Sequence, residues 1–244
     1  MKVIINSDDF GLSRSINKGI IEAFNEGLIS STTLMINMPY AEEAIELYKQ
    51  VEGLGMGVHL NITAGSPLSS NIPSLVDENN IFYRIKDFKN HVVVFDEAYK
   101  EMKAQIEKVL SYDINISHID CHHFLVENDT FREIIIILGK EYNVPVRILG
   151  DSMKKECEEV GVKTADMFFE DFYGDNAKSE TILNLVNENS NCSSIEFMCH
   201  LGYIDEDTKT RTSYLNRENE INELRKLKGL GFYETIELIN YHNL

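Results

Sequence analysis

The chain has 244 residues, 43% hydrophobic and 26% charged, a composition typical of a globular domain with a large core. It carries 40 Asp and Glu against 23 Lys and Arg, and the net charge of -17 argues against a nucleic-acid partner. Trp is absent, which disfavours a long open groove for stacking sugars, although 11 Tyr and 12 Phe could supply a small one.

The cellular location is inferred from what the sequence lacks. The first apolar run is too short, and becomes acidic too soon, for a signal peptide, and no segment reaches transmembrane length. Its four cysteines form no C-x-x-C pair. We therefore expect a cytoplasmic protein with reduced thiols and no membrane partner. Because no Pro/Gly/Ser-rich linker divides the chain, we expect a single domain over residues 1–244.

Strand and helix patterns alternate along the chain. The first strand is a β-branched run that begins at residue 3 and ends in Asp8 and Asp9, and Ser13 stands where it can cap the helix that follows. Residues 63–80 form a loop, and residues 81–95 form short strands or an irregular lid. Further strands are predicted at 31–36, 55–61, 114–121, 144–148, 164–169, 194–199 and 232–234, and further helices at 39–48, 96–110, 131–142, 153–159, 179–186 and 214–228.

This alternation predicts βαβ units around a parallel sheet, and so an α/β fold. With seven or eight parallel strands in a chain of this size, we favour a TIM-like (β/α) barrel. An open doubly wound sheet stays an alternative, because periodicity does not show whether a sheet closes.

Residues with chemical function gather at the predicted carboxyl ends of strands. In a parallel barrel these ends open on one face, so residues far apart in the sequence meet in one pocket. A carboxylate with two neutral imidazoles is a common set of ligands for a divalent metal ion. The strand-end residues are Asp8, Asp9, His59, Asp120, His122, His123, Arg147, Cys199 and His200.

Each of these residues also has a structural interpretation. An isolated Asp-Asp pair is more often a turn or a cap than a metal site, and His59 could be a core histidine with satisfied hydrogen bonds. His122 and His123 could be one buried and one exposed imidazole, and Arg147 could simply pair with a carboxylate. The metal site is favoured because the histidine motifs and the Asp pair all fall at strand ends and none falls at a strand start.

The two adjacent aspartates suggest a division of roles. On an extended backbone their side chains point in opposite directions, so one can bind the ion while the other reaches a water molecule or the substrate. A metal ion lowers the pKa of a bound water, and a second carboxylate can take its proton. His200 could protonate the leaving group, and Asp120 could orient an imidazole.

Four segments resemble the YdjC-like carbohydrate deacetylases, a family that includes chitooligosaccharide deacetylases. They are NSDDFGLS at residues 6–13, GVHLNITAGSP at 57–67, HIDCHH at 118–123 and EFMCHLGY at 196–203. Their order and spacing match the family over nearly the whole chain, and the signal lies in the set rather than in any one segment.

This resemblance implies a distorted TIM-like barrel that hydrolyses the acetamide of an N-acetylated sugar or oligosaccharide and releases acetate. It also implies a divalent metal ion, magnesium first and zinc or another transition metal otherwise, and a homodimer. By motif, the metal ligands would be Asp9, His59 and His122, with Asp8 as the general base and His200 as the general acid. We further expect substrate contacts from Phe10, Asn61, Arg147 and Tyr203, and support for a ligand imidazole from Asp120.

The chain departs from the family pattern in two places. Phe124 and Val126 stand where the family continues its run of histidines, and Leu201 stands where it usually has proline. The ligand set is untouched, but the pocket wall changes, so the substrate need not be a chitooligosaccharide.

Two other functions stay open. One is a metal-dependent phosphoesterase or aldolase on the same barrel, for which Arg147 is the available phosphate clamp. The other is a non-catalytic sugar-binding homologue, which the missing histidines would allow.

Overall fold

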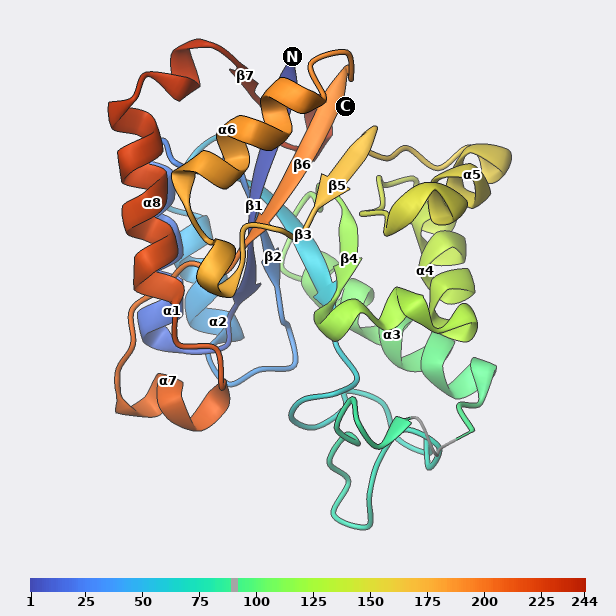
Figure 1. Ribbon diagram of the computed structural model, residues 1–244. Helices are drawn as coiled ribbons and strands as arrows, with labels where there is room; N and C mark the ends of the chain where they lie inside the picture. Colours follow the sequence, from blue (N-terminus) through green and yellow to red (C-terminus); the bar gives the residue numbers. More distant parts are fainter. Residues whose placement is uncertain (89–91) are drawn as a thin grey trace. The chain divides into compact units, whose positions relative to one another are not determined.

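A computed structural model describes residues 1–88 and 92–244, without the side chain of Phe124. The predicted segment 81–95 therefore contains three residues, 89–91, that lie outside the description. The chain divides into two compact units (Figure 1). The first unit comprises Met1–Leu34, Pro39–Met56 and Ala165–Leu244, and the second comprises Met35–Met38 and Gly57–Thr164.

The first unit is built around strand β1 (Lys2–Phe10), nearly all of which is buried. It pairs in parallel with β2 (Ser31–Leu34), β6 (Ser194–Cys199) and β7 (Glu237–Leu238). Strand β5 (Met167–Phe169) adds to β6, also in parallel. A strand buried on both faces reads as a continuous apolar run, which explains why the start of β1 was recognisable from sequence.

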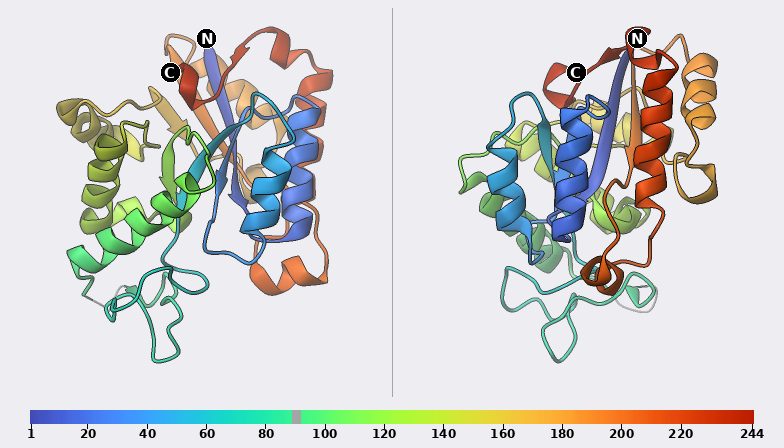
Figure 2. Two further views of the ribbon diagram at one scale, coloured as in Figure 1. Left: turned by 180° about the vertical axis from the view of Figure 1, so that it is seen from behind. Right: turned by 90° about the vertical axis from the view of Figure 1, so that its left-hand side faces the viewer.

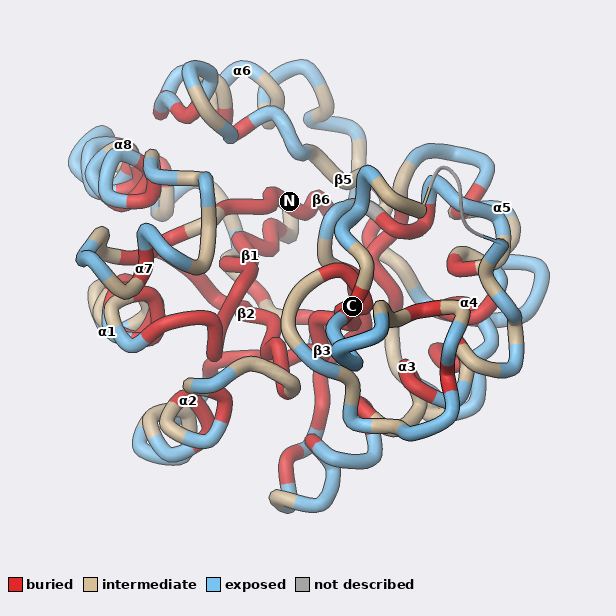
Figure 3. The backbone as a smooth tube through the Cα atoms, turned by 90° about the horizontal axis from the view of Figure 1, so that it is seen from below, coloured by how far each residue is buried: buried red, intermediate tan, exposed pale blue. Residues whose placement is uncertain are grey.

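Helices cover one face of this layer of strands. Figures 2 and 3 show α1, α2 and α8 side by side along β2, β1 and β6. Ser13 caps α1 as expected, because its side chain accepts a hydrogen bond from the amide of Ile16. The helices of this unit are α1 (Arg14–Asn25), α2 (Ala41–Tyr48), α6 (Ser179–Glu188), α7 (Glu206–Arg211) and α8 (Arg217–Gly229), and a 3₁₀ turn η3 (Gly174–Asn176) precedes α6.

The strand predicted at residues 232–234 is wrong, because this segment is the 3₁₀ turn η4 (Phe232–Glu234). Gly231 adopts a left-handed conformation with φ 76°, and its carbonyl accepts from the amide of Glu234, which closes a turn. Strand pairing starts only at Glu237, in β7. The chain then ends in the 3₁₀ turn η5 (Tyr241–Asn243), and Figure 2 shows this end beside the start of β1. Lys2 Nζ donates to the carbonyl of Asn243 at 2.7 Å.

The second unit takes up strand β3 (Gly55–Leu60) from Gly57 onward and pairs it in parallel with β4 (Ile119–Cys121). Three helices, α3 (Phe95–Leu110), α4 (Asp129–Tyr142) and α5 (Gly150–Val160), and the 3₁₀ helix η2 (His122–Glu127) complete the elements described for it. The strand predicted at 144–148 is reduced to a single bridge between Ile119 and Val146. Pro145 has no amide hydrogen to donate, which prevents the ladder from extending towards the start of the predicted strand.

The predicted α/β class with parallel strands is confirmed. The described residues form seven strands, three of which have only two or three residues. Closure into a TIM-like barrel and a single domain over 1–244 stay predictions. Among the residues that the structure describes, no helix combines the length and the apolarity needed to cross a membrane.

Candidate active site

The carboxyl end of β1 departs from regular strand geometry at its two aspartates. The pairing register with β2 shifts between Ser7 and Phe10, and Asp9 adopts a φ of 70°. A left-handed conformation is uncommon for a residue with a side chain, and such strain concentrates at functional sites. Asp8 and Asp9 are both buried, each with 2% of its surface exposed. The expectation that both lie on an extended backbone is wrong at Asp9.

Asp9 forms an ion pair with Arg217, the first residue of α8. Arg217 Nη2 donates to Asp9 Oδ2 at 2.5 Å, and the arginine is completely buried. Two adjacent carboxylates are costly to bury without positive charge nearby, and the guanidinium supplies part of it. The pair also fixes the orientation of the Asp9 carboxylate.

Asp8 has a different partner, the side chain of Asn6 two residues earlier in β1. Asn6 Nδ2 donates to Asp8 Oδ1 at 2.8 Å and lies 3.3 Å from the hydroxyl of Thr33. The Asn6 amide carries no net charge, whereas the guanidinium bound to Asp9 is a full positive charge. The two aspartates therefore differ in electrostatic environment as well as in position.

His200 directly follows β6, whose last residue, Cys199, pairs with Ser7 of β1. Its backbone amide donates to Glu220 Oε2 at 2.5 Å, and the next amide, of Leu201, donates to the Ser7 hydroxyl at 3.1 Å. The imidazole packs against two phenol rings, with centroids 5.4 Å from Tyr173 and 5.4 Å from Tyr214. Its place at the strand end is therefore fixed from both β1 and α8.

Glu220 of α8 is a buried carboxyl group beside this histidine. It accepts hydrogen bonds from the His200 amide and from the hydroxyl of Tyr214. Burial raises the pKa of Glu220 to about 8, although both hydrogen bonds and Arg217 act to lower it. Burial and the adjacent Glu220 carboxylate also raise the pKa of Tyr214 well above its usual value.

In the second unit, Asp120 connects His59 to Arg147. Its Oδ1 lies 2.8 Å from His59 Nδ1, and its Oδ2 lies 2.7 Å from Arg147 Nη1. Burial acts to raise the pKa of Asp120, but Arg147 and His59 lower it by more, so the pKa lies well below its usual range. Because Asp120 is ionised, it accepts a hydrogen bond from His59 Nδ1, and Nε2 is the ring nitrogen directed away from this carboxylate.

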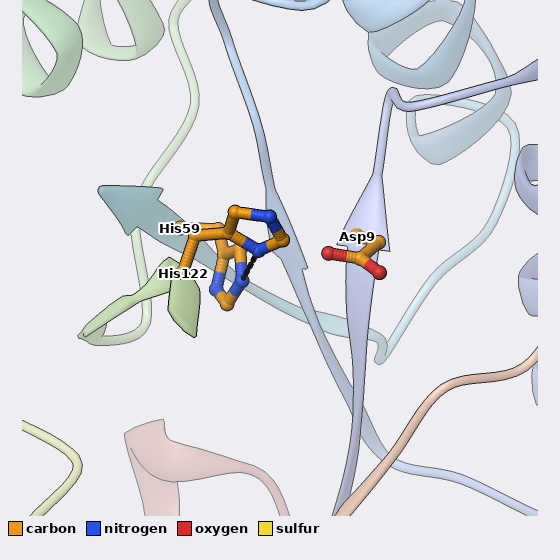
Figure 4. Close-up of side chains that lie close together, drawn as sticks. All are labelled: Asp9, His59 and His122. Carbon is orange, nitrogen blue, oxygen red and sulfur yellow. Dashed lines mark hydrogen bonds between the residues drawn. The ribbon is translucent and has the colours of Figure 1, made fainter. Parts of the chain in front are cut away.

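His59 Nε2 faces a second imidazole. His59 Nε2 lies 3.3 Å from Nδ1 of His122, the first residue of η2 (Figure 4). His123 is placed differently, with φ 58° and its Nδ1 2.9 Å from the hydroxyl of Thr63. Two imidazole nitrogens that face each other at this distance either share a proton or coordinate a cation, so the pair suits a divalent metal ion.

The four residues predicted to contact substrate all have roles within the protein. Phe10 is completely buried, and Arg147 pairs with Asp120. Asn61 organises the loop after β3, since its side chain accepts from the Thr63 amide at 3.0 Å and donates to the Ala64 carbonyl at 2.8 Å. The Tyr203 hydroxyl donates to Glu22 on α1 at 2.6 Å. Substrate contact by these four residues stays a prediction.

Four residues beside the site were not predicted from the sequence: Arg217, Glu220, Tyr214 and Tyr173. Two of them could have been found, because Arg217 and Glu220 share the apolar face of their helix with Ile221 and Leu224. A charged residue on a face that must be buried signals a specific partner. For the two tyrosines no comparable pattern exists, because they lie in loops.

Comparison with known proteins supports a relationship along the whole chain. The sequence profile of YdjC-like proteins matches residues 2–236. A carbohydrate deacetylase of Clostridium beijerinckii is 37% identical over 248 residues and one of Brevibacillus brevis is 34% identical over 252, with 100% of each chain covered in both cases. A solved structure from Enterococcus faecalis V583, whose name proposes cellobiose-phosphate cleavage, is 32% identical with a TM-score of 0.92, covering 99% of this chain and 98% of its own.

The predicted family is therefore confirmed, and the chain belongs to the YdjC-like family.

Proposed function

We propose that the chain is a metal-dependent carbohydrate deacetylase that removes the acetyl group from an N-acetylated sugar or oligosaccharide. The geometric observation that carries the proposal is the oriented imidazole of His59, whose Nε2 faces His122. Its wider support is the similarity, over the full length, to proteins named carbohydrate deacetylase. The whole chain would act as one catalytic domain.

The proposed metal ligands are Asp9, His59 and His122, the set that the family motif implies. One carboxylate and two neutral imidazoles form a set that suits zinc, manganese, nickel or cobalt, while the family resemblance points first to magnesium. Asp120 would hold His59 in the required tautomer, and Arg217 would hold Asp9. A divalent ion bound there would lower the pKa of a water molecule and polarise the acetamide carbonyl.

Residues of the chain would carry the proton transfers. Asp8 would take a proton from the attacking water, while Asp9, paired with Arg217, would bind the metal ion. As the C–N bond breaks, His200 would give a proton to the departing amine, so that acetate and a free amino sugar leave. The phenol ring of Tyr214, whose centroid lies 5.4 Å from that of His200, would help to hold this imidazole in place.

The test is acetate release from N,N'-diacetylchitobiose and related N-acetylated sugars, with bound metal measured in the same preparations. Asp9→Asn should lose both the metal and the turnover. Asp8→Asn should keep the metal and lose roughly a hundredfold or more in kcat. Turnover that persists in Asp9→Asn, or in protein stripped of metal, would overturn the mechanism.

Metal identity follows from the same experiment when Mg²⁺ and Zn²⁺ are added back separately to stripped protein. The identity of the sugar needs its own measurement, because Val126 and Leu201 depart from the family pattern. A panel of mono- and disaccharides that carry an acetamide, chitooligosaccharides among them, resolves this point. Homodimer formation and a cytoplasmic location stay predictions.

The name of the Enterococcus faecalis structure favours cleavage of a phosphorylated sugar as a second candidate. The pairing of Arg147 argues against a phosphoesterase or aldolase. This proposed phosphate clamp is buried, and its guanidinium lies 2.7 Å from the Asp120 carboxylate. Release of phosphate or of a cleaved sugar, without release of acetate, would favour this reaction. Metal-independent sugar binding without any turnover would favour a non-catalytic homologue.

A further inference from the structure

Tyr173 is an exposed aromatic residue beside His200. It is 45% exposed, although its ring stacks on that of Tyr214 with centroids 4.1 Å apart and planes inclined by 15°. The ring also meets His200 in a T-shaped contact at 5.4 Å. Since Tyr214 covers one face of the ring, the opposite face and the ring edge are left to account for the exposed surface of Tyr173.

Side chains near the start of α8 fix the backbone around Tyr173. The Gly174 amide donates to the Tyr214 hydroxyl at 2.9 Å, and Asn216 Nδ2 donates to the Gly174 carbonyl at 2.7 Å. Asn219 Nδ2 donates to the carbonyl of Ala177 at 3.0 Å, at the far end of the same turn. An aromatic ring held in this way loses little conformational entropy when it binds a ligand.

The same network connects Tyr173 to the proposed general acid. The buried Glu220 carboxyl group accepts from the hydroxyl of Tyr214, which supports Tyr173, and from the backbone amide of His200. A ligand that stacks on the Tyr173 ring is therefore held at a fixed position relative to His200. An exposed tyrosine that does not contact substrate would not need this link through Tyr214 and Glu220 to His200.

We propose that the open face of Tyr173 stacks against a sugar ring of the substrate and so positions the sugar next to His200. This inference rests on the deacetylase function proposed above. The axial C–H groups of a pyranose present a flat, weakly polar face that matches an aromatic ring, and the neighbouring Asp175 and Asn176 have polar side chains that suit its hydroxyls. A single ring among polar neighbours suits a sugar better than a protein partner, which would need a larger apolar patch.

The absence of Trp from the sequence gives a direct test of binding. In Tyr173→Trp the introduced indole is the only one in the chain, and it reports on what lies against it. The probe is chitobiose with free amino groups, which has no acetyl group to lose. Its addition to the full-length, metal-loaded variant should change the fluorescence of this indole in a saturable manner.

The matched control is Tyr48→Trp. Tyr48 is the last residue of α2, and the helix of a βαβ unit returns to the amino ends of the strands, away from the end that carries His200. Its fluorescence should not respond. Equal fluorescence responses from both variants would overturn the stacking proposal. The absence of a response from Tyr173→Trp, with acetate release by the native chain, would also overturn it but would leave the deacetylase function intact. Absence of both the fluorescence response and acetate release would overturn both.

Kinetics of two further variants separate stacking from general damage. Tyr173→Ala should raise KM for N,N'-diacetylchitobiose about tenfold with little change in kcat, because it removes an aromatic contact that the ground state and the transition state share. Tyr173→Phe keeps the ring and should retain a KM close to that of the native chain. A tenfold rise in KM for Tyr173→Phe as well would contradict stacking and assign the effect to the hydroxyl.

Discussion

At the scale of single residues, Asp8 and Asp9 are neighbours in the sequence but have different partners. Asp9 is bound by the buried guanidinium of Arg217, and Asp8 by the neutral amide of Asn6. The φ of 70° at Asp9 is what turns its carboxylate out of the regular strand pattern. The proposed division between a metal ligand and a base therefore has a structural counterpart in these two environments.

Arg217→Met should destabilise the metal-free protein by roughly 3–5 kcal/mol, because it leaves the Asp9 charge buried without its guanidinium. The control is Arg225→Met on the same helix, which breaks an ion pair with Glu26 that is 41% and 39% exposed. Such an exposed pair contributes only about 0–1 kcal/mol. Urea unfolding at pH 7 compares the two variants, and similar losses would contradict the importance of the buried pair.

The buried Glu220 carboxyl group should make the free energy of unfolding depend on pH. Its pKa is about 8 in the folded chain, whereas a glutamate ordinarily titrates near 4.5. Between these values the folded state holds a proton that the unfolded state has lost, so stability should fall as the pH rises from about 4.5 to about 8. The charged or titratable groups that act on Glu220 are Tyr214, Arg217 and Asp8.

Glu220→Gln should flatten this slope, because an amide does not titrate. The introduced glutamine side chain can still accept a hydrogen bond from the His200 amide and donate one to the Tyr214 hydroxyl. The measurement is the free energy of unfolding at pH 5, 6.5 and 8, with chelator present. Histidines titrate in both proteins, so their effect cancels in the comparison. Parallel curves for the native chain and the variant would mean that Glu220 is already ionised at pH 5.

At the scale of elements, helix α8 connects the ends of β1 and β6. Its first turn supplies Arg217 to Asp9 and Glu220 to His200, three residues apart on one helical face. The loop after β6 is also held from α1, where Gly202 and Gly19 approach so closely that a Cβ on Gly19 would lie 2.6 Å from the Gly202 Cα. The place of His200 thus depends on two helices.

Gly19→Ala should displace the loop that carries His200. The added methyl group meets backbone atoms that have no room to move, so we expect a loss of about 1–3 kcal/mol in stability and a lower rate of acetate release. The control is Gly229→Ala at the end of α8, where a Cβ meets nothing within 4 Å. That variant should be neutral or slightly stabilised. Full activity in Gly19→Ala would show that the loop position is unimportant.

At the scale of the whole molecule, the net charge of -17 and the cluster of buried carboxylates favour cations over anions. A ligand that binds only the folded state stabilises it by mass action, by about 2.7 kcal/mol at a concentration one hundred times its Kd. Removal of a bound divalent ion should therefore lower the unfolding temperature of this chain.

Two adjacent histidines provide the test of this stabilisation. His122→Gln should abolish the rise in unfolding temperature on addition of Zn²⁺ or Mn²⁺, since His122 is a proposed ligand. His123→Gln should retain the rise, because His123 is directed to the Thr63 hydroxyl instead. Thermal unfolding with and without chelator measures both variants. Loss of the rise in His123→Gln alone would reassign the ligand.

The sequence by itself determined the family, the α/β class and the clustering of Asp and His at strand ends. These features are local: buried parallel strands leave continuous apolar runs, and the residues after them mark the strand ends. The sequence also predicted that Asp120 would orient an imidazole, and in the structure it pairs with His59 at 2.8 Å. It did not determine the ends of short strands, because turn geometry at Gly231 and the missing amide of Pro145 outweighed their strand propensity.

Only the tertiary structure decided which partners the charged groups have. Arg217 lies 208 residues from Asp9 in the sequence, and Glu220 lies 20 residues from His200. No local pattern encodes such pairs, because they form only when α8 packs against the ends of β1 and β6. The physical reason is desolvation: a buried charge must find a partner, and folding selects that partner in space rather than along the chain.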